Sequence, residues 1–337
     1  MAATNVEVWQ RAVVRGTRDV AEGIRRIVLA PGQPVPAAAG THVDVMVTIA
    51  GEKHRRSYSV VETHDGGREL AISVFRTAAS RGGSVFMHTL TPGDELEITQ
   101  PLQNFPLRVG APRYLLLAGG VGITAILNMA RVLKTVKADY RLVYAGRNRS
   151  AMAYLAELQE EHGAALEIHV DAEGSGLSVT ELVEGLQDGT ELYMCGPIRL
   201  MDAVRRSWRA RELDPANLRY ETFGNSGWHR PEEFIVRVPR LGLETVVGPG
   251  KSMLEALEDA GADMMFDCRK GECGLCEVRI LDLQGTVDHR DVFYSERQQR
   301  AREKMCCCVS RAVTEPPVRP GVSGLQPSPA VVTIEVS

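Results

Sequence analysis

The run DCRKGECGLC, residues Asp267–Cys276, places three cysteines at Cys268, Cys273 and Cys276 in the spacing C-x4-C-x2-C. A plant-type [2Fe-2S] centre uses this spacing, with three thiolates from one loop and a fourth from a later segment. Gly271 and Gly274 leave room for the backbone to wind tightly around a cluster, where a Cβ would obstruct. The run therefore predicts an iron–sulfur domain in the last third of the chain.

Two other uses of these cysteines fit the sequence less well. A structural zinc site normally shows paired C-x2-C motifs, or one such motif with paired histidines, and the sequence has neither arrangement. A disulfide framework needs a secreted chain, but the opening residues MAATNV have no basic or apolar segment of a signal peptide. An odd total of seven cysteines suits a reducing compartment, so we expect a cytoplasmic protein.

Length and charge limit the remaining possibilities. A chain of 337 residues exceeds the size at which one hydrophobic core stops growing, so it should form two or three domains. The net charge of −4 argues against nucleic acid as the main partner. No apolar run approaches the length of a membrane span, so we expect no membrane association.

The first third of the chain has the pattern of a small antiparallel β-barrel. Short β-rich segments are separated by turn-forming residues such as Asp65-Gly66-Gly67 and Pro92-Gly93-Asp94. Six such segments favour a barrel. The predicted strands are Val6–Val14, Ile24–Leu29, His42–Ile49, Ser57–Val61, Leu70–Phe75 and Glu95–Ile98.

Two motifs in this barrel could bind a phosphorylated ligand. Arg56-Ser57-Tyr58-Ser59 offers a cation, an aromatic ring and hydroxyl groups on one strand. Ser80-Arg81-Gly82-Gly83-Ser84 precedes a predicted helix, Val85–Leu90. Exposed backbone N–H groups at a helix start attract phosphate, and Arg81 adds a forked donor. Each motif alone is weak, and the two together predict a phosphate site.

The middle third alternates between strands and helices, which predicts a parallel sheet covered on both faces. Ligands of such sheets bind beyond the carboxyl ends of the strands. Two motifs fall there: the glycine turn Gly119–Thr124 and the turn Cys195-Gly196-Pro197. The predicted elements are strands Tyr114–Ala118, Arg141–Tyr144, Leu166–Val170, Glu191–Met194 and Leu218–Thr222, with helices Ala125–Leu133, Ala151–Glu160, Val179–Leu186 and Leu200–Arg211.

The last third contains the cysteine run. A hairpin is predicted from Phe234–Val238 and Leu243–Val247, and Ser252 with Glu255 forms a capping box before a helix ending near Ala260. The further predicted elements are strand Glu277–Leu281, a helix from about Ser295 and strand Val331–Val336. The predicted domains are 1–108, 109–225 and 233–337, with a linker at 226–232.

Over nearly its whole length the chain resembles the phthalate dioxygenase reductase family, which includes the vanillate demethylase reductases. The family supplies electrons to Rieske-type oxygenases. The resemblance implies an FMN-binding β-barrel, an NAD-binding α/β domain and a C-terminal β-grasp ferredoxin that together pass electrons from NADH to an oxygenase, and a monomer. The segments that carry it, in family order, are RRSYSV (55–60), SRGGS (80–84), NFPL (104–107), GGVGIT (119–124), YMCGP (193–197), DCRKGECGLCEV (267–278) and CVSRA (308–312).

The resemblance also assigns roles to individual residues. Ser59, Cys195 and Phe223 would lie beside the reacting rings and are the catalytic candidates. The cofactor-binding candidates are Arg56, Ser57, Tyr58, Ser59, Val74, Arg81, Gly82, Gly83 and Ser84 for the flavin, Gly120, Gly122, Thr124, Cys195, Gly196 and Pro197 for NADH, and Phe223 as the aromatic cover of the flavin.

The fourth cluster ligand must come from Cys306-Cys307-Cys308. Counting from Cys276, Cys306 leaves the usual ferredoxin gap of 29 residues, 277–305. The motifs Asp288–Asp291 (DHRD) and Ser310–Ala312 (SRA) fix the register as in relatives, however, and make Cys308 the ligand. We therefore predict Cys268, Cys273, Cys276 and Cys308, with Cys306 as the alternative.

Three departures from the family and several alternatives remain. Ala125 replaces the usual proline, about two extra residues lie near Asp282–Gly285, and a proline-rich insert, 315–329, of no predicted function follows SRA. FAD in place of FMN is a less favoured alternative. Arg147 and Arg149 could meet the 2′-phosphate of NADPH. The acceptor could instead be a cytochrome P450, and the chain could be a redox sensor without turnover.

Overall fold

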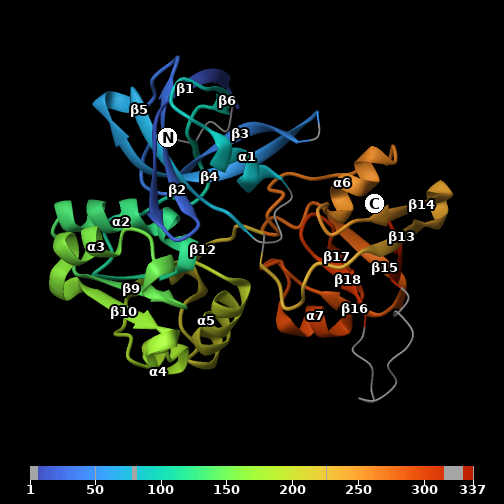
Figure 1. The fold of residues 1–337 in the computed structure, drawn as a ribbon. Coiled ribbons are helices and arrows are strands. Elements are labelled where there is room, and N and C mark those ends of the chain that lie inside the picture. Colours follow the sequence, from blue (N-terminus) through green and yellow to red (C-terminus); the bar gives the residue numbers. More distant parts are fainter. Residues whose placement is uncertain (1–6, 50, 78–81, 225, 315–328, 337) are drawn as a thin grey trace. The chain divides into compact units, whose positions relative to one another are not determined.

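The computed structural model describes residues 7–49, 51–77, 82–224, 226–314 and 329–336 and forms two compact units, Met1–Glu221 and Thr222–Ser337 (Figure 1). The predicted phosphate-site residues Ser80 and Arg81 lie outside the described residues, as does most of the proline-rich insert. The units separate at residues 221 and 222, so the predicted domain limits at residues 108 and 232 stay predictions.

Six antiparallel strands close into a barrel in the first unit, which confirms the predicted architecture. They pair in the order β4-β5-β2-β1-β6-β3, and β3 also pairs with β4. Alternate residues of β3, Val43, Val45 and Val47, are fully buried and fill the interior. The strands are β1 (Trp9–Ala21), β2 (Ile24–Pro31), β3 (Thr41–Ile49), β4 (Glu52–His64), β5 (Glu69–Phe75) and β6 (Glu95–Thr99), followed by an unpredicted two-residue β7 (Leu102–Gln103) on β3, and one helix, α1 (Gly83–Thr89).

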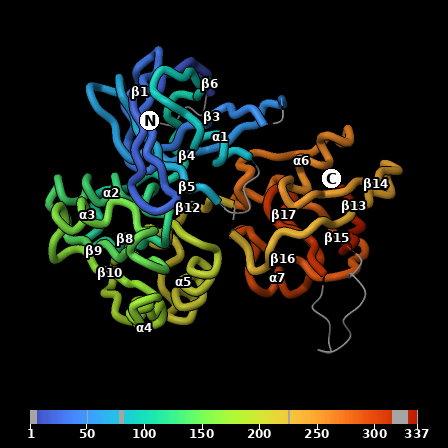
Figure 2. The backbone as a smooth tube through the Cα atoms, in the orientation of Figure 1, coloured from blue at the N-terminus to red at the C-terminus, as the bar shows by residue number. Residues whose placement is uncertain are grey.

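The rest of the first unit is a parallel sheet in the order β10-β9-β8-β11-β12. The order reverses after β8, so right-handed crossovers put α2 and α3 on one face and α4 and α5 on the other (Figures 1 and 2). The crevice between the ends of β8 and β11 is the expected ligand position. The elements are β8 (Arg113–Gly119), α2 (Ile123–Thr135), β9 (Tyr140–Gly146), α3 (Leu155–His162), β10 (Leu166–Val170), α4 (Val179–Glu184), β11 (Thr190–Cys195), α5 (Ile198–Ala210) and β12 (Leu218–Glu221).

Helix α3 begins four residues later than predicted. Tyr154, just before it, has a left-handed backbone with φ of 62°, which interrupts the helical pattern. Its hydroxyl is 2.5 Å from Ser73 Oγ on β5, and the Glu22 N–H donates to the Ser150 carbonyl at 2.7 Å. These bonds attach the segment to the barrel, so tertiary contacts override the local helical preference.

The second unit is a β-grasp fold, as predicted. Its main sheet has the order β14-β13-β19-β15-β17, in which β13 and β19 are parallel. The predicted Ser252–Glu255 capping box is present, and the extra residues near Asp282 form part of a bulged β15. The elements are β13 (Phe234–Val238), β14 (Leu243–Val247), α6 (Met253–Asp259), β15 (Glu277–Gln284), β16 (Thr286–Asp288), α7 (Glu296–Ala301), β17 (Lys304–Cys306), β18 (Arg311–Val313) and β19 (Ala330–Glu335).

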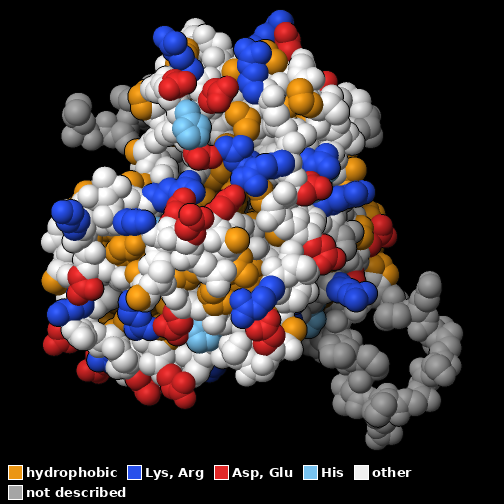
Figure 3. Space-filling view, turned by 60° about the vertical axis from the view of Figure 1, so that its left-hand side comes forward, with side chains coloured by type: hydrophobic (Ala, Val, Ile, Leu, Met, Phe, Trp, Pro, Cys, Tyr) orange, Lys and Arg blue, Asp and Glu red, His pale blue; other side chains and the backbone are white. Residues whose placement is uncertain are grey.

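The surface is mixed in charge. Acidic and basic side chains are interspersed over the face shown in Figure 3, in keeping with the small net charge of the chain. Within the described part of the chain, no helix is both long and apolar enough to span a bilayer.

Candidate functional sites

The two motifs at the ends of β8 and β11 pack directly against each other. A Cβ built on Gly122 would lie 2.2 Å from the Cys195 carbonyl oxygen, and one on Gly196 would lie 3.1 Å from Gly119 Cα. Only glycine permits this approach. Thr124 is buried, and its hydroxyl donates to the Val121 carbonyl at 3.0 Å, so Thr124 supports the glycine turn itself.

Glu221 is a buried acid that the sequence analysis did not select. It pairs with Cys195 across the β11–β12 ladder, and Ser59 Oγ donates to its Oε2 at 3.4 Å. Its exposed fraction is 3%. Glu221 thus connects two of the predicted catalytic residues, Ser59 through a hydrogen bond and Cys195 as its register partner on the neighbouring strand. A charged residue ending the strand LRYE was the available signal.

The strand β4 presents its predicted residues on two faces, because successive side chains alternate. Arg56 lies against the start of α1: a Cβ on Gly83 would be 3.1 Å from Arg56 Cγ and Nε. Tyr58 packs against the barrel core, and burial raises the pKa of its hydroxyl. Ser57, on the other face, donates to the buried carboxylate of Asp44.

The remaining predicted residues of the nucleotide and flavin sites are dispersed. Val74 is buried in β5, and its carbonyl oxygen is 2.8 Å from His88 Nε2. Ser84 Oγ accepts from the Thr77 N–H at 3.4 Å. Pro197 caps α5 and accepts the Leu200 N–H at 2.9 Å. Phe223 is half-buried and belongs to the second unit, next to Thr222.

The cysteine loop directs backbone N–H groups at sulfur. The N–H groups of Lys270, Glu272 and Cys273 each approach Cys268 Sγ at 3.4 Å. Such donors stabilise a thiolate, although burial leaves the pKa of Cys268 raised overall. Gly274 has φ of 76°, and a Cβ there would be 2.3 Å from the Phe293 ring. The glycine therefore lets the ring cover the loop.

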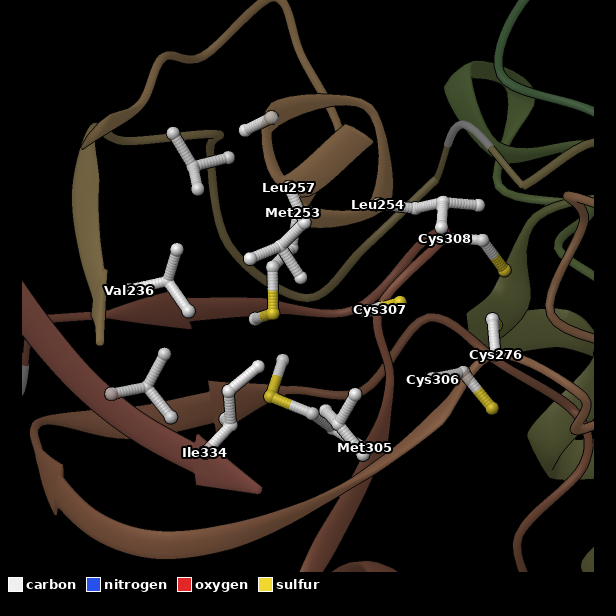
Figure 4. Close-up of a cluster of buried hydrophobic side chains, with 14 of the residues drawn as sticks. Val236, Met253, Leu254, Leu257, Cys276, Met305, Cys306, Cys307, Cys308 and Ile334 are labelled. Atoms are coloured by element: carbon white, nitrogen blue, oxygen red, sulfur yellow. The ribbon is translucent and has the colours of Figure 1, made fainter. Parts of the chain in front are cut away.

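The fourth-ligand candidates surround Cys276. Hydrogen bonding with the thiols of Cys306, Cys307 and Cys308 lowers the pKa of Cys276 well below its usual value and raises the pKa of each of those three thiols. Figure 4 shows the sulfurs of Cys306 and Cys308 turned to the side of Cys276, away from the aliphatic side chains of the core. All four residues belong to this core cluster.

A buried polar network joins the DHRD and SRA motifs. Ser310 Oγ donates to Asp291 Oδ1 at 2.9 Å, the Arg290 N–H donates to Ser310 Oγ at 3.2 Å, and Asp288 pairs with Arg311 in the β16–β18 ladder. A Cβ on Gly271 would lie 2.6 Å from Val309 and 2.9 Å from Asp291 Cα. The cysteine loop thus rests on Asp291 of the DHRD motif and on Val309, the residue just before the SRA motif.

The residues at both sites fit the iron–sulfur cluster and the dinucleotide that the sequence predicts. Thiolate donors with N–H groups aimed at sulfur suit an iron–sulfur cluster, and the narrow glycine contacts suit close approach of a pyrophosphate. Among the described residues, no group of three or more His, Cys, Asp or Glu side chains is placed so that it could hold a single metal ion. A [2Fe-2S] centre does not need one, because four ligands shared by two irons give each iron two cysteines.

Comparisons with known proteins agree with this fold and site chemistry. Residues 236–313 match the family described as a 2Fe-2S iron–sulfur cluster binding domain, which confirms the iron–sulfur prediction. Residues 100–218 match the N-terminal domain of proteins like dimethylamine monooxygenase subunit DmmA.

The similarity extends over nearly the whole chain. The carnitine monooxygenase reductase subunit of Acinetobacter pittii is 32% identical over 83% of this chain and 91% of its own length. The solved structure of phthalate dioxygenase reductase aligns with a TM-score of 0.72 at 28% identity, covering 97% of this chain and 98% of that one. An intact type IV self-sufficient cytochrome P450 monooxygenase aligns at 0.64 and 31%, over 97% of this chain and 41% of that longer one. The chain belongs to the family of oxygenase reductase subunits that includes phthalate dioxygenase reductase.

Proposed function

We propose that this chain carries electrons from NADH through FMN and a [2Fe-2S] cluster to an oxygenase component. One observation carries the proposal. Glu221 accepts a hydrogen bond from Ser59 and is the register partner of Cys195 at the strand ends of a parallel sheet, in the same chain as a cysteine loop whose N–H groups point at sulfur. FMN accepts a hydride and releases electrons singly, which joins a two-electron donor to a one-electron carrier.

The barrel residues hold the flavin in this proposal. Arg56, lying along Gly83, supplies a forked donor for the phosphate, together with Gly82, Ser84 and Arg81. This grip is complete without an adenosine, which favours FMN over FAD. Tyr58 packs beside the flavin ring, and Phe223 covers it.

Cys195, Glu221 and Ser59 position the reacting rings. Gly122 and Gly196 keep the glycine turn and the Cys195 turn at a fixed separation, so a pyrophosphate bound at one holds the nicotinamide at the other. Glu221 accepts the Ser59 hydrogen bond and fixes the direction of the hydroxyl.

Cys268, Cys273, Cys276 and Cys308 are the proposed cluster ligands. Cys308 is favoured over Cys306 because the DHRD and SRA motifs hold its register. Ser310 Oγ donates to Asp291 Oδ1 at 2.9 Å, and Val309, the residue after Cys308, lies against Gly271 of the cysteine loop. Cys308 is also 5% exposed, in line with a cluster near the surface, and Cys306 is fully buried.

The electron acceptor is a Rieske-type oxygenase in this proposal, and the reductase acts as a cytoplasmic monomer. Leu275 within the cysteine loop is 47% exposed and Phe293 beside it is 43% exposed. Apolar side chains in such positions give an acceptor a dry contact close to the cluster.

Anaerobic titration with NADH tests the proposal. Purified protein with two irons and two acid-labile sulfides per chain should bleach in the flavin and cluster absorption bands in stoichiometric steps. Protein that binds zinc without sulfide would contradict the iron–sulfur centre. A cluster that stays oxidised while the flavin is reduced would contradict the electron relay.

A cytochrome P450 is the second candidate acceptor, because a self-sufficient P450 contains a region similar to this whole chain. Stopped-flow mixing of the reduced reductase with a purified Rieske oxygenase and with a purified P450 separates the two. The proposed acceptor should oxidise the reductase much faster than the other does.

A further inference from the structure

The strand ends of the parallel sheet form a row that fixes where each part of a dinucleotide lies. The register partners in this row are Glu221 on β12, Cys195 on β11, Ala118 on β8, Tyr144 on β9 and Ile168 on β10. If the proposed function holds, the nicotinamide lies near Cys195 and the pyrophosphate at the glycine turn. The adenosine then lies beyond β9 and β10, over the segments 147–151 and 171–173.

One ion pair joins these two segments. Arg149 Nε and Nη2 donate to Glu173 Oε1 and Oε2 at 2.7 and 2.9 Å, in a two-pronged arrangement. The Ala172 N–H donates to the Arg147 carbonyl at 2.9 Å, so the backbones are tied as well. The Arg149 side chain is 49% exposed and that of Glu173 is 43% exposed, which leaves the pair within reach of a ligand from solvent.

We propose that Glu173, by holding Arg149, makes this site prefer the 2′-hydroxyl of NADH over the 2′-phosphate of NADPH. A 2′-phosphate requires the forked guanidinium that Glu173 already occupies. Arg147 and Arg149 are matched by Asp171 and Glu173, so the two segments carry no net charge to attract a dianion. A 2′-hydroxyl has no charge to repel and can accept or donate hydrogen bonds with the same groups.

Substitution of Glu173 by Gln should release Arg149 without removing bulk. The probe is 2′,5′-ADP, which carries the 2′-phosphate but no nicotinamide, with 5′-AMP as reference. Calorimetry should find 2′,5′-ADP bound on the order of tenfold more tightly by Glu173→Gln than by the unmodified protein, because one carboxylate charge is lost and one guanidinium becomes available. Binding of 5′-AMP should stay within about twofold.

Glu167→Gln is the matched control. Arg141 Nη2 donates to Glu167 Oε2 at 2.6 Å between β9 and β10, the strands that lead into the segments 147–151 and 171–173, and the side-chain exposures are 50% and 41%. Arg141 lies five residues before Gly146, roughly 16 Å back along the strand. This control should leave the preference for 5′-AMP over 2′,5′-ADP unchanged.

The double variant Arg149→Ala/Glu173→Gln should lose the gain in 2′,5′-ADP binding. An unchanged affinity in Glu173→Gln, an equal gain in Glu167→Gln, or a gain kept by the double variant would each overturn the inference. Failure of the proposed function would appear separately, as a protein that does not oxidise NADH. In a protein that does, the ratio of kcat/KM for NADPH to that for NADH should rise with Glu173→Gln.

Discussion

The sites in the two units depend on different kinds of contact, one between backbone atoms and the other between side chains. In the first unit, backbone meets backbone: Gly122 stands against the Cys195 carbonyl and Gly196 against Gly119. In the second unit, the cysteine loop rests on buried charged and polar side chains, chiefly Asp291 and Ser310. The nucleotide site should therefore be most sensitive to added volume, and the cluster site to lost ligands and lost hydrogen bonds.

The largest effect is expected from the fourth cluster ligand. Cys308→Ser should abolish the cluster, because a serine oxygen is a poor replacement for a thiolate on iron. Cys306→Ser should retain the cluster. Iron and sulfide analysis with visible absorption measures both variants, and the reverse pattern would make Cys306 the ligand.

Added volume at the nucleotide site should have the next largest effect. Gly122→Ala puts a Cβ 2.2 Å from the Cys195 oxygen, so the two turns must separate at a cost of about 1–3 kcal/mol in unfolding free energy. NADH affinity should fall at least about tenfold, since one tenfold step is about 1.4 kcal/mol. Gly16→Ala, with nothing within 4 Å of the new Cβ, should change neither quantity, and equal losses in both variants would refute the contact argument.

Loss of a buried hydrogen bond should affect the second unit more moderately. Asp291 is fully buried and accepts from Ser310 Oγ at 2.9 Å and from the Tyr294 N–H at 3.0 Å. Asp291→Asn should destabilise this unit by about 1–3 kcal/mol, seen as earlier thermal loss of cluster absorbance. Asp259→Asn, which removes only an exposed pair with Lys251, should cost less than about 1 kcal/mol. Equal shifts would mean that burial does not matter here.

The smallest expected effect is on how the unfolding free energy of the first unit depends on pH in the acid range. Burial raises the pKa of Glu62, but a hydrogen bond from Arg26 and the charges of Arg26, His64 and Arg131 lower it overall. A lowered folded-state pKa gives stability that is present above the usual value of 4.5 and is lost as pH falls through the folded pKa. Glu62→Gln should thus flatten the decline in unfolding free energy between pH 5 and the folded pKa, by at most about 1 kcal/mol for a partly exposed pair. Urea unfolding across this range measures it; an unchanged slope would contradict the assignment.

The sequence predicted the features that depend on local pattern. Strand alternation and turn residues gave the six barrel strands, and cysteine spacing gave the iron–sulfur loop. Contacts between distant segments could not be predicted from such local patterns. Ser59 donates a hydrogen bond to Glu221, 162 positions further along the chain. Tyr154 has a left-handed backbone, and its hydroxyl forms a hydrogen bond with Ser73. The ligand and cofactor residues stay predictions, and Arg81 lies outside the described residues.

Arg311 has a consequence for how the second unit matures. It is 4% exposed, and its guanidinium donates to the carbonyls of Lys251, Glu232 and Gly248, at 2.7, 2.9 and 2.9 Å, while stacking 5.0 Å from the Phe234 ring centre. Small metalloproteins often need their metal to draw such segments together. Here one side chain already does so, and we expect the chain to fold first and receive iron and sulfide afterwards. Chelator-treated protein should keep its far-ultraviolet circular dichroism; its loss would mean that assembly and folding are one event.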